Sequence, residues 1–333
     1  EPETVPGTLF TYNNGATLTL SALVSAVTGQ RLLDFAGEHL LGHLGAKAAV
    51  WDSAGTIDAG YSGLHVNTDT ITRLGLTYLD SGSFQGTRIV PTSWVREASA
   101  VQVLNADRGA SVDWQQGYGF QFWRSTHGFR GDGAYGQFCL VLPDRDMVVV
   151  TTGAIADMQS VLDRVWRILL PSLADQPLPD DRAGFDALTK RLAGLTIPLG
   201  PGEPGRPDRP AGAWDLMPSG APADTLHIGA LRLTGQGETW TLTIDDGVGR
   251  YPVPVGRQWT RAEFALGADV LRLAGVGSWT GPTEFSGQVI LINTPHRFGL
   301  RCDVAAGRAE LTWHTTPLED RPLAGRALPA PAG

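Results

Sequence analysis

The sequence has 333 residues, of which 42% are hydrophobic and 18% charged, and its formal net charge is −8. This is an ordinary globular balance, and the length suggests about two domains. The negative charge and the lack of any Lys or Arg cluster argue against a nucleic-acid or anionic-membrane surface. No apolar run reaches the roughly 18 residues of a membrane-spanning helix.

The first part of the chain predicts helices. Apolar residues at helical spacing predict one helix over residues 16–28, ending at Gly29, and a second over residues 32–44. His39 and His43 lie one turn apart on the second helix, a spacing that can bind a metal. Because neither an HExxH pattern nor a third ligand accompanies them, surface histidines are favoured and no metal site is predicted.

Three further helices and a strand are predicted before residue 171. The helices are expected at residues 69–79, 93–101 and 157–170. Residues 105–116 are polar and are predicted to form a mobile loop. Residues 117–123 alternate between apolar and polar positions and predict a strand.

A glycine-rich stretch, residues 131–136, leads into the apolar run Phe138–Leu142. A second β-rich run, residues 147–152, follows a short Pro/Asp turn, so an antiparallel hairpin is predicted. Its glycines allow a backbone to approach a ligand closely, because no Cβ intervenes. We therefore expect the hairpin to be the wall of an active site; a purely structural turn is the alternative.

The same glycine-rich stretch fits the dinucleotide pattern G-x-G-x-x-G. That motif must follow a strand and open a helix, whose N-terminus then binds the pyrophosphate. A β-type run follows here instead. Nucleotide binding is therefore not predicted, and no cofactor is expected.

The composition changes after residue 174. Residues 198–210 are rich in proline and glycine and predict a linker. Strand candidates then recur about every ten residues, which predicts a small barrel or sandwich. They are residues 225–233, 239–244, 270–273, 284–292, 297–304 and 308–314. Strand alternation places Trp240, Leu242, Leu271, Leu273, Val289, Leu291 and Trp313 in its core.

These patterns predict an α+β domain at residues 1–175, because helices precede an antiparallel hairpin set and another helix follows. A helix and the linker are expected at residues 176–210. A small all-β domain is expected at residues 211–333. The two cysteines, Cys139 and Cys302, are too few for a disulfide framework.

Two motifs near the N-terminus carry a family resemblance. Residues 6–14 read Pro-Gly-x-x-Phe-x-Tyr-x-Asn, and residues 27–32 read Val-Thr-Gly-Gln-x-Leu. With the glycine hairpin in residues 117–150, they resemble the penicillin-recognising serine hydrolases, in the class C β-lactamase and esterase branch. The resemblance covers residues 4–170 and implies an antiparallel sheet flanked by helices. The β-rich tail is similar to a barrel-like or lipocalin-like accessory domain in some of these hydrolases.

The resemblance implies roles for several residues. In this family the nucleophile and its lysine come from a Ser-x-x-Lys motif. Tyr12 is then the proton-transfer partner, Asn14 a substrate contact and the Ala134 N–H an oxyanion donor. The small-molecule substrate is expected to lie along the hairpin edge, formed by Arg130, Gly131, Asp132, Gly133 and Tyr135. The resemblance also favours an extracytoplasmic location.

The sequence departs from the family pattern in two places. No Ser-x-x-Lys exists, because Leu44 precedes Lys47 by three residues and Ala187 precedes Lys190. We expect an N-terminal segment missing from this chain to supply the nucleophile, so this chain alone is expected to be inactive. Gly131 stands where Lys or His is expected, which favours an esterase or peptidase-like substrate over a β-lactam. The alternative is a non-catalytic pseudo-hydrolase with a ligand-binding barrel.

Overall fold

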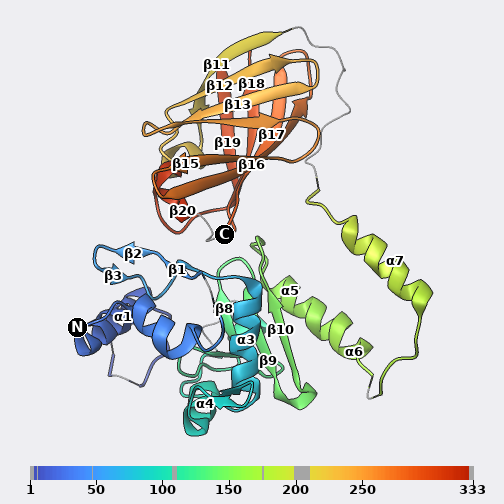
Figure 1. The fold of residues 1–333 in the computed structure, drawn as a ribbon. Coiled ribbons are helices and arrows are strands. Elements are labelled where there is room, and N and C mark those ends of the chain that lie inside the picture. The colour runs from blue at the N-terminus through green and yellow to red at the C-terminus, as the bar shows by residue number, and fades with distance from the viewer. Residues whose placement is uncertain are drawn as a thin grey trace. The chain divides into compact units, whose positions relative to one another are not determined.

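The computed structural model describes residues 4–5, 7–46, 48–106, 111–174, 176–198 and 211–329. Two compact units make up the chain, Glu1–Arg167 and Ile168–Ala330. Figure 1 labels most of their helices and strands. From residue 199 onward, the predicted linker lies outside the described residues.

A four-stranded antiparallel sheet forms the centre of the first unit, in the order β10-β9-β8-β7. Its strands are β7 Trp123–Arg124, β8 Phe129–Gly133, β9 Gln137–Leu142 and β10 Met147–Thr151. The side chains of β9 are buried from Phe138 to Leu142. The turn into β10 is closed by Asp146, which takes a left-handed φ of 47°, as Asp tolerates in turns. The predicted hairpin is confirmed.

Helix α3, Thr68–Leu79, packs against β9 and β10 (Figure 1). It begins at Asn67, whose side chain accepts a hydrogen bond from the Thr70 N–H at 2.8 Å, a favourable N-cap. Gly75 faces the sheet, where an added Cβ would lie 2.6 Å from Cγ1 of Val148 and 2.8 Å from Sγ of Cys139. Only glycine allows this close packing.

The other helices of the unit lie close to the predicted ranges. They are α1 Asn14–Thr28, α2 Leu32–Ala36, α4 Thr92–Ser99 and α5 Gln159–Arg164. Two π-helical turns, Gly37–Leu41 and Val165–Leu169, extend α2 and α5, and α6 Leu170–Ser172 follows across the unit boundary. Three short antiparallel pairs complete the unit: β1 Val50–Trp51 with β4 Leu64–His65, β2 Ser53–Ala54 with β3 Ile57–Asp58, and β5 Ser83–Phe84 with β6 Thr87–Arg88.

Two predictions for this unit were wrong. Residues 117–122 form no strand, because positive φ angles at Gly117 (99°) and Gln121 (63°) turn the backbone. The segment predicted as a mobile loop, residues 105–116, instead holds a 3-10 helix, Val112–Trp114, and a completely buried Asp113. Residues 107–110 of that segment lie outside the described part.

The second unit contains helix α7, Arg182–Ala193, and a large sheet in the order β14-β13-β12-β11-β19-β18-β17-β16-β15, with β20 beside β16. All pairs are antiparallel except β11 with β19. The strands are β11 Gly212–Ser219, β12 Ala230–Gln236, β13 Thr239–Asp245, β14 Arg250–Val255, β15 Thr260–Leu266, β16 Asp269–Trp279, β17 Glu284–Leu291, β18 Arg297–Asp303, β19 Arg308–Thr315 and β20 Leu328–Pro329. Two short helices accompany them, α8 Ala221–Thr225 and the 3-10 helix Leu323–Arg326.

The edges of this sheet approach each other. Strand β14 packs on β15 and β16, and the Gly277 N–H donates to the Gly256 carbonyl at 2.9 Å. The sheet is therefore a nearly closed barrel, and the predicted fold class, α+β followed by an all-β near-barrel, is confirmed. The strand predicted at residues 225–233 was wrong in its first half, where α8 ends and a turn follows.

The barrel core matches the predicted alternation. Six of the seven residues expected there are buried: Trp240, Leu242, Leu271, Leu273, Val289 and Leu291. The seventh, Trp313, is half-buried and packs against this core. Tryptophans 214, 240 and 279 lie within 5.1–5.8 Å of one another, centroid to centroid. Among the described residues, no helix is long and apolar enough to cross a lipid bilayer.

Candidate active site

An aromatic pocket of about 470 Å³ lies beside Tyr12 in the first unit. Its lining residues are Phe10, Thr11, Tyr12, Ser111, Trp114, Trp123, Ala156, Asp157, Met158 and Gln159. The Tyr12 ring stacks on Trp123, with 5.7 Å between centroids and 19° between planes. Trp123 is a buried residue of β7, so the Tyr12 ring, which is itself 57% exposed, packs against the sheet. The volume suits a small ligand.

Tyr12 is protonated at neutral pH in this environment. Burial raises its pKa above the usual 10, and the nearby charge of Asp132 raises it further. A tyrosine accepts a proton as a base only when a cation lowers its pKa. Among the described residues that line the pocket, none is Lys, Arg or His, so this lining holds no cation that would lower the pKa of Tyr12.

Asp132 lies in β8 at the hairpin edge, with its side chain only 6% exposed. The Arg130 guanidinium contacts its Oδ2 through Nη2 at 3.0 Å and Nε at 3.1 Å. Burial raises the pKa of Asp132 to about 6, outweighing the opposite effects of Arg130 and of a hydrogen bond from Trp114. Asp132 is therefore a titratable group close to neutral pH, and its charge acts on Tyr12.

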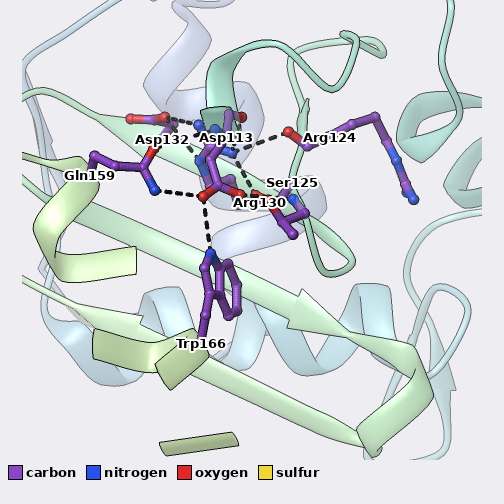
Figure 2. Close-up of polar contacts among 8 residues, drawn as sticks. Asp113, Arg124, Ser125, Arg130, Asp132, Gln159 and Trp166 are labelled. Atoms are coloured by element: carbon purple, nitrogen blue, oxygen red, sulfur yellow. Dashed lines mark hydrogen bonds and ion pairs between the residues drawn. The ribbon is translucent and has the colours of Figure 1, made fainter. Parts of the chain in front are cut away.

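Arg130 is completely buried. Its Nη1 donates hydrogen bonds to the carbonyls of Asp113 at 2.9 Å and Arg124 at 3.2 Å (Figure 2). The guanidinium also lies 4.4 Å from the ring centroid of Trp114, a cation–π contact. Burial lowers the pKa of Arg130, while the carboxylates of Asp132 and Asp113 raise it. Arg130 does not line the pocket; its guanidinium lies behind the hairpin edge, against Asp132.

Asp113 connects three parts of the unit (Figure 2). Its carboxylate accepts hydrogen bonds from the Thr126 N–H at 2.8 Å, from Nε2 of Gln159 at 2.7 Å and from Nε1 of Trp166 at 3.0 Å. Burial raises the pKa of Asp113, but these hydrogen bonds outweigh it and lower the pKa. Gln159 and Trp114 both line the pocket, so Asp113 holds two of its walls together.

The turn between β8 and β9 carries Ala134 and Tyr135. Ala134 is exposed at its tip, and Tyr135 takes a left-handed φ of 68°. Gln137 fixes this turn, because its Nε2 donates to the Ala134 carbonyl at 3.2 Å and to the Gly153 carbonyl at 2.6 Å. The backbone edge is therefore held rigidly.

The predicted site residues are brought together in part. Tyr12 lines the pocket, and Asp132 lies close enough for its charge to act on it. Gly131 and Gly133 occupy β8 beside Asp132. Asn14 is the exposed first residue of α1, and the side chain of Asn13 caps that helix. Of the predicted site residues, only Tyr12 is among the described residues that line the pocket; the others lie outside its lining: Asn14, Arg130, Gly131, Asp132, Gly133, Ala134 and Tyr135.

Sequence reasoning missed Asp113, Trp114, Trp123 and Gln159. They come from three separate segments, so no spacing rule joins them. One available signal was the pair of tryptophans on either side of residues 115–122, since large aromatic residues are usually buried or functional. His39 and His43 are exposed, and the described residues contain no group of three or more potential metal ligands.

A pH dependence of stability follows from Asp132. Its pKa in the folded chain, about 6, exceeds the ordinary 3.8, so the folded state binds this proton more tightly than the unfolded state. Asp132 therefore favours folding fully below about pH 4, and this contribution is lost as the pH rises through about 6. The expected size is about 1.4 kcal/mol per pKa unit.

Denaturant unfolding of the native chain and Asp132→Asn at several pH values between 4 and 7 measures this contribution. Their difference in free energy of unfolding should change in favour of the variant as the pH rises. The lowered pKa of Asp113 has the opposite effect on stability. Because Asp113 is present in both proteins, its contribution cancels in the difference. A difference that stays constant with pH would contradict the raised pKa of Asp132.

The antiparallel sheet, its covering helix and the pocket beside Tyr12 define an α+β unit with one candidate site. Residues 1–157 match the model of the beta-lactamase family, so this part of the chain is a beta-lactamase-family, serine hydrolase-like region. No curated protein matches the chain.

One similar solved structure is named "Putative 6-aminohexanoate-dimer hydrolase from Bacillus anthracis". It is 24% identical to this chain, and the match covers 54% of this chain and 48% of that one, with a TM-score of 0.46. The chain thus spans about half the length of that hydrolase.

Proposed function

We propose that the first unit is part of a serine hydrolase that acts through an acyl-enzyme on a small ester, amide or peptide-like substrate. The observation that carries the proposal is Tyr12 in the wall of a ligand-sized pocket, within a region that matches the beta-lactamase family. The nucleophilic serine and its lysine come, in this proposal, from a Ser-x-x-Lys segment that residues 1–333 do not contain.

The proposed chemistry needs a nucleophile, a base within hydrogen-bond reach and donors aimed at the oxyanion. The serine Oγ attacks the substrate carbonyl, and its proton passes to Tyr12. The positive charge of the lysine lowers the pKa of Tyr12, against the effects of burial and Asp132. The Ala134 N–H then stabilises the oxyanion of the tetrahedral intermediate. This intermediate collapses, the bond to the alcohol or amine leaving group breaks, and Tyr12 returns its proton to that group. Water finally hydrolyses the acyl-enzyme, which releases the acid and restores the serine.

In the same proposal the substrate lies along the edge of β8. Gly131 and Gly133 allow the substrate to approach the backbone closely, and Asn14 and Tyr135 are its proposed side-chain contacts. Arg130 acts through Asp132, because its own side chain is completely buried. The partner of this region is thus a small molecule together with the nucleophile-bearing segment.

The second candidate function is a non-catalytic pseudo-hydrolase that binds a ligand. Two observations favour it: the sequence contains no Ser-x-x-Lys, and the pKa of Tyr12 is raised. A pseudo-hydrolase would bind small molecules in the pocket without forming a covalent intermediate.

Extending the chain upstream with a Ser-x-x-Lys segment tests the proposal. Hydrolysis of a short p-nitrophenyl ester should appear, and should disappear when the serine of that motif is changed to alanine. An extended protein that folds but hydrolyses no ester or amide would favour the pseudo-hydrolase instead.

We also propose the domain division 1–175, 176–210 and 211–333. The proline- and glycine-rich composition of residues 198–210 is typical of a linker. Limited proteolysis is expected to cut there first and to release a β-rich fragment that resists further cleavage. First cuts within residues 211–329, with the linker intact, would contradict this division.

A further inference from the structure

The pocket beside Tyr12 combines aromatic walls with negative charge. Four aromatic residues contribute to its lining: Phe10, Tyr12, Trp114 and Trp123. Asp157 is the charged residue among the lining residues, and it is exposed. At neutral pH this part of the chain therefore offers aromatic side chains and a carboxylate to an incoming group.

The groups behind the pocket wall carry net negative charge. The Arg130 guanidinium lies against Trp114, and this positive charge alone would repel a cation. Two carboxylates offset it: Asp132 pairs with the guanidinium at 3.0 Å, and the charge of Asp113 also acts on it. With both carboxylates ionised, these three groups sum to one negative charge.

This environment discriminates between ligands by charge. An anionic group would meet the like charge of Asp157, and no Lys, Arg or His among the described lining residues would pair with it, so its binding is disfavoured. A neutral group gains only from burial against the rings. An ammonium group gains in addition from the ring faces and from the carboxylates.

We propose that this pocket binds an ammonium group, and that the substrate of the proposed hydrolase is an amine-bearing or quaternary-ammonium ester or amide. The substrate part of this inference rests on the proposed function. The binding part depends only on the pocket and can be tested without turnover.

Three probes of nearly equal shape test the binding part: choline, its neutral carbon analogue 3,3-dimethylbutan-1-ol, and the anion 3,3-dimethylbutyrate. Their dissociation constants are measured by ligand-observed NMR on the whole chain at pH 7.5 and low salt. Choline is expected to bind about three- to thirtyfold more tightly than the alcohol, and the anion most weakly. Equal binding of choline and the alcohol would overturn the proposal.

Asp157→Asn tests the contribution of the charge at the pocket. Asp157 accepts a hydrogen bond from the Ser160 N–H at 3.2 Å, and asparagine preserves such a cap, so folding should be retained. The preference for choline over the alcohol is expected to fall roughly two- to fivefold. Raising the salt concentration should reduce the preference of the native chain in the same direction.

Asp146→Asn is the matched control, since Asp146 lies at the β9–β10 turn, at the opposite end of β9 from the Ala134 turn. It removes the same charge and should leave the preference unchanged. A preference that survives both Asp157→Asn and high salt would overturn the proposal. A chain that binds choline, but hydrolyses no ester after the upstream extension, would contradict the proposed function alone.

Discussion

Replacing Arg130 by methionine is expected to lower the free energy of unfolding of the first unit by about 3–5 kcal/mol. The substitution removes the cation that pairs with Asp132 and the donor to the carbonyls of Asp113 and Arg124. Because these partners lie in the interior, each would lose its hydrogen bond without gaining water. Urea unfolding followed by tryptophan fluorescence measures the change.

Arg145→Met is the control for this substitution. Arg145 is exposed in the 3-10 turn between β9 and β10, and surface substitutions of this kind usually change stability by less than about 0.5 kcal/mol. Similar unfolding curves for Arg130→Met and Arg145→Met would show that the buried network contributes nothing to stability.

Tyr12→Phe is expected to lower the rate of ester hydrolysis by about 10²–10⁴ in the protein that carries the Ser-x-x-Lys segment, the usual contribution of a positioned acid–base group. The phenylalanine ring keeps the stacking on Trp123, so substrate binding should change less than the rate. Steady-state kinetics that separate kcat from KM measure both quantities.

Tyr78→Phe provides the matched control, since Tyr78 lies on α3 and its ring packs 4.5 Å from Phe122. Tyr78→Phe also removes a tyrosine hydroxyl, but Tyr78 does not line the pocket, so kcat should stay unchanged. A Tyr12→Phe variant as active as Tyr78→Phe would remove Tyr12 from the proton transfer.

The elements with strong periodicity could be predicted from sequence. The runs Phe138–Leu142 and Met147–Val150 have the residues of buried strands around a Pro/Asp turn, and they form β9 and β10. Alternation also placed most of the barrel core. Strand β14 was missed, because Pro252 and Pro254 are unfavourable in central strands; the strand lies at the sheet edge, where they are tolerated.

A site residue could be predicted from sequence only where it belongs to a recognisable local motif. Tyr12 came from such a motif, whereas the residues around it depend on tertiary structure. Asp113 stands in a polar segment with nothing local to indicate that Thr126, Gln159 and Trp166 would bury and bind it. The burial of Arg130 was equally hidden, since a strand pattern does not show which charged side chain finds buried partners.

Labelling the 333-residue chain with a fluorophosphonate tests the central claim most directly. The claim is that the first unit provides the pocket, Tyr12 and the hairpin edge, while a separate Ser-x-x-Lys segment provides the nucleophile. The chain alone is therefore expected to show no covalent adduct by intact-mass measurement, and the protein extended with that segment is expected to gain one adduct. Stoichiometric labelling of the chain alone at a single serine would contradict the account and identify that serine as the nucleophile.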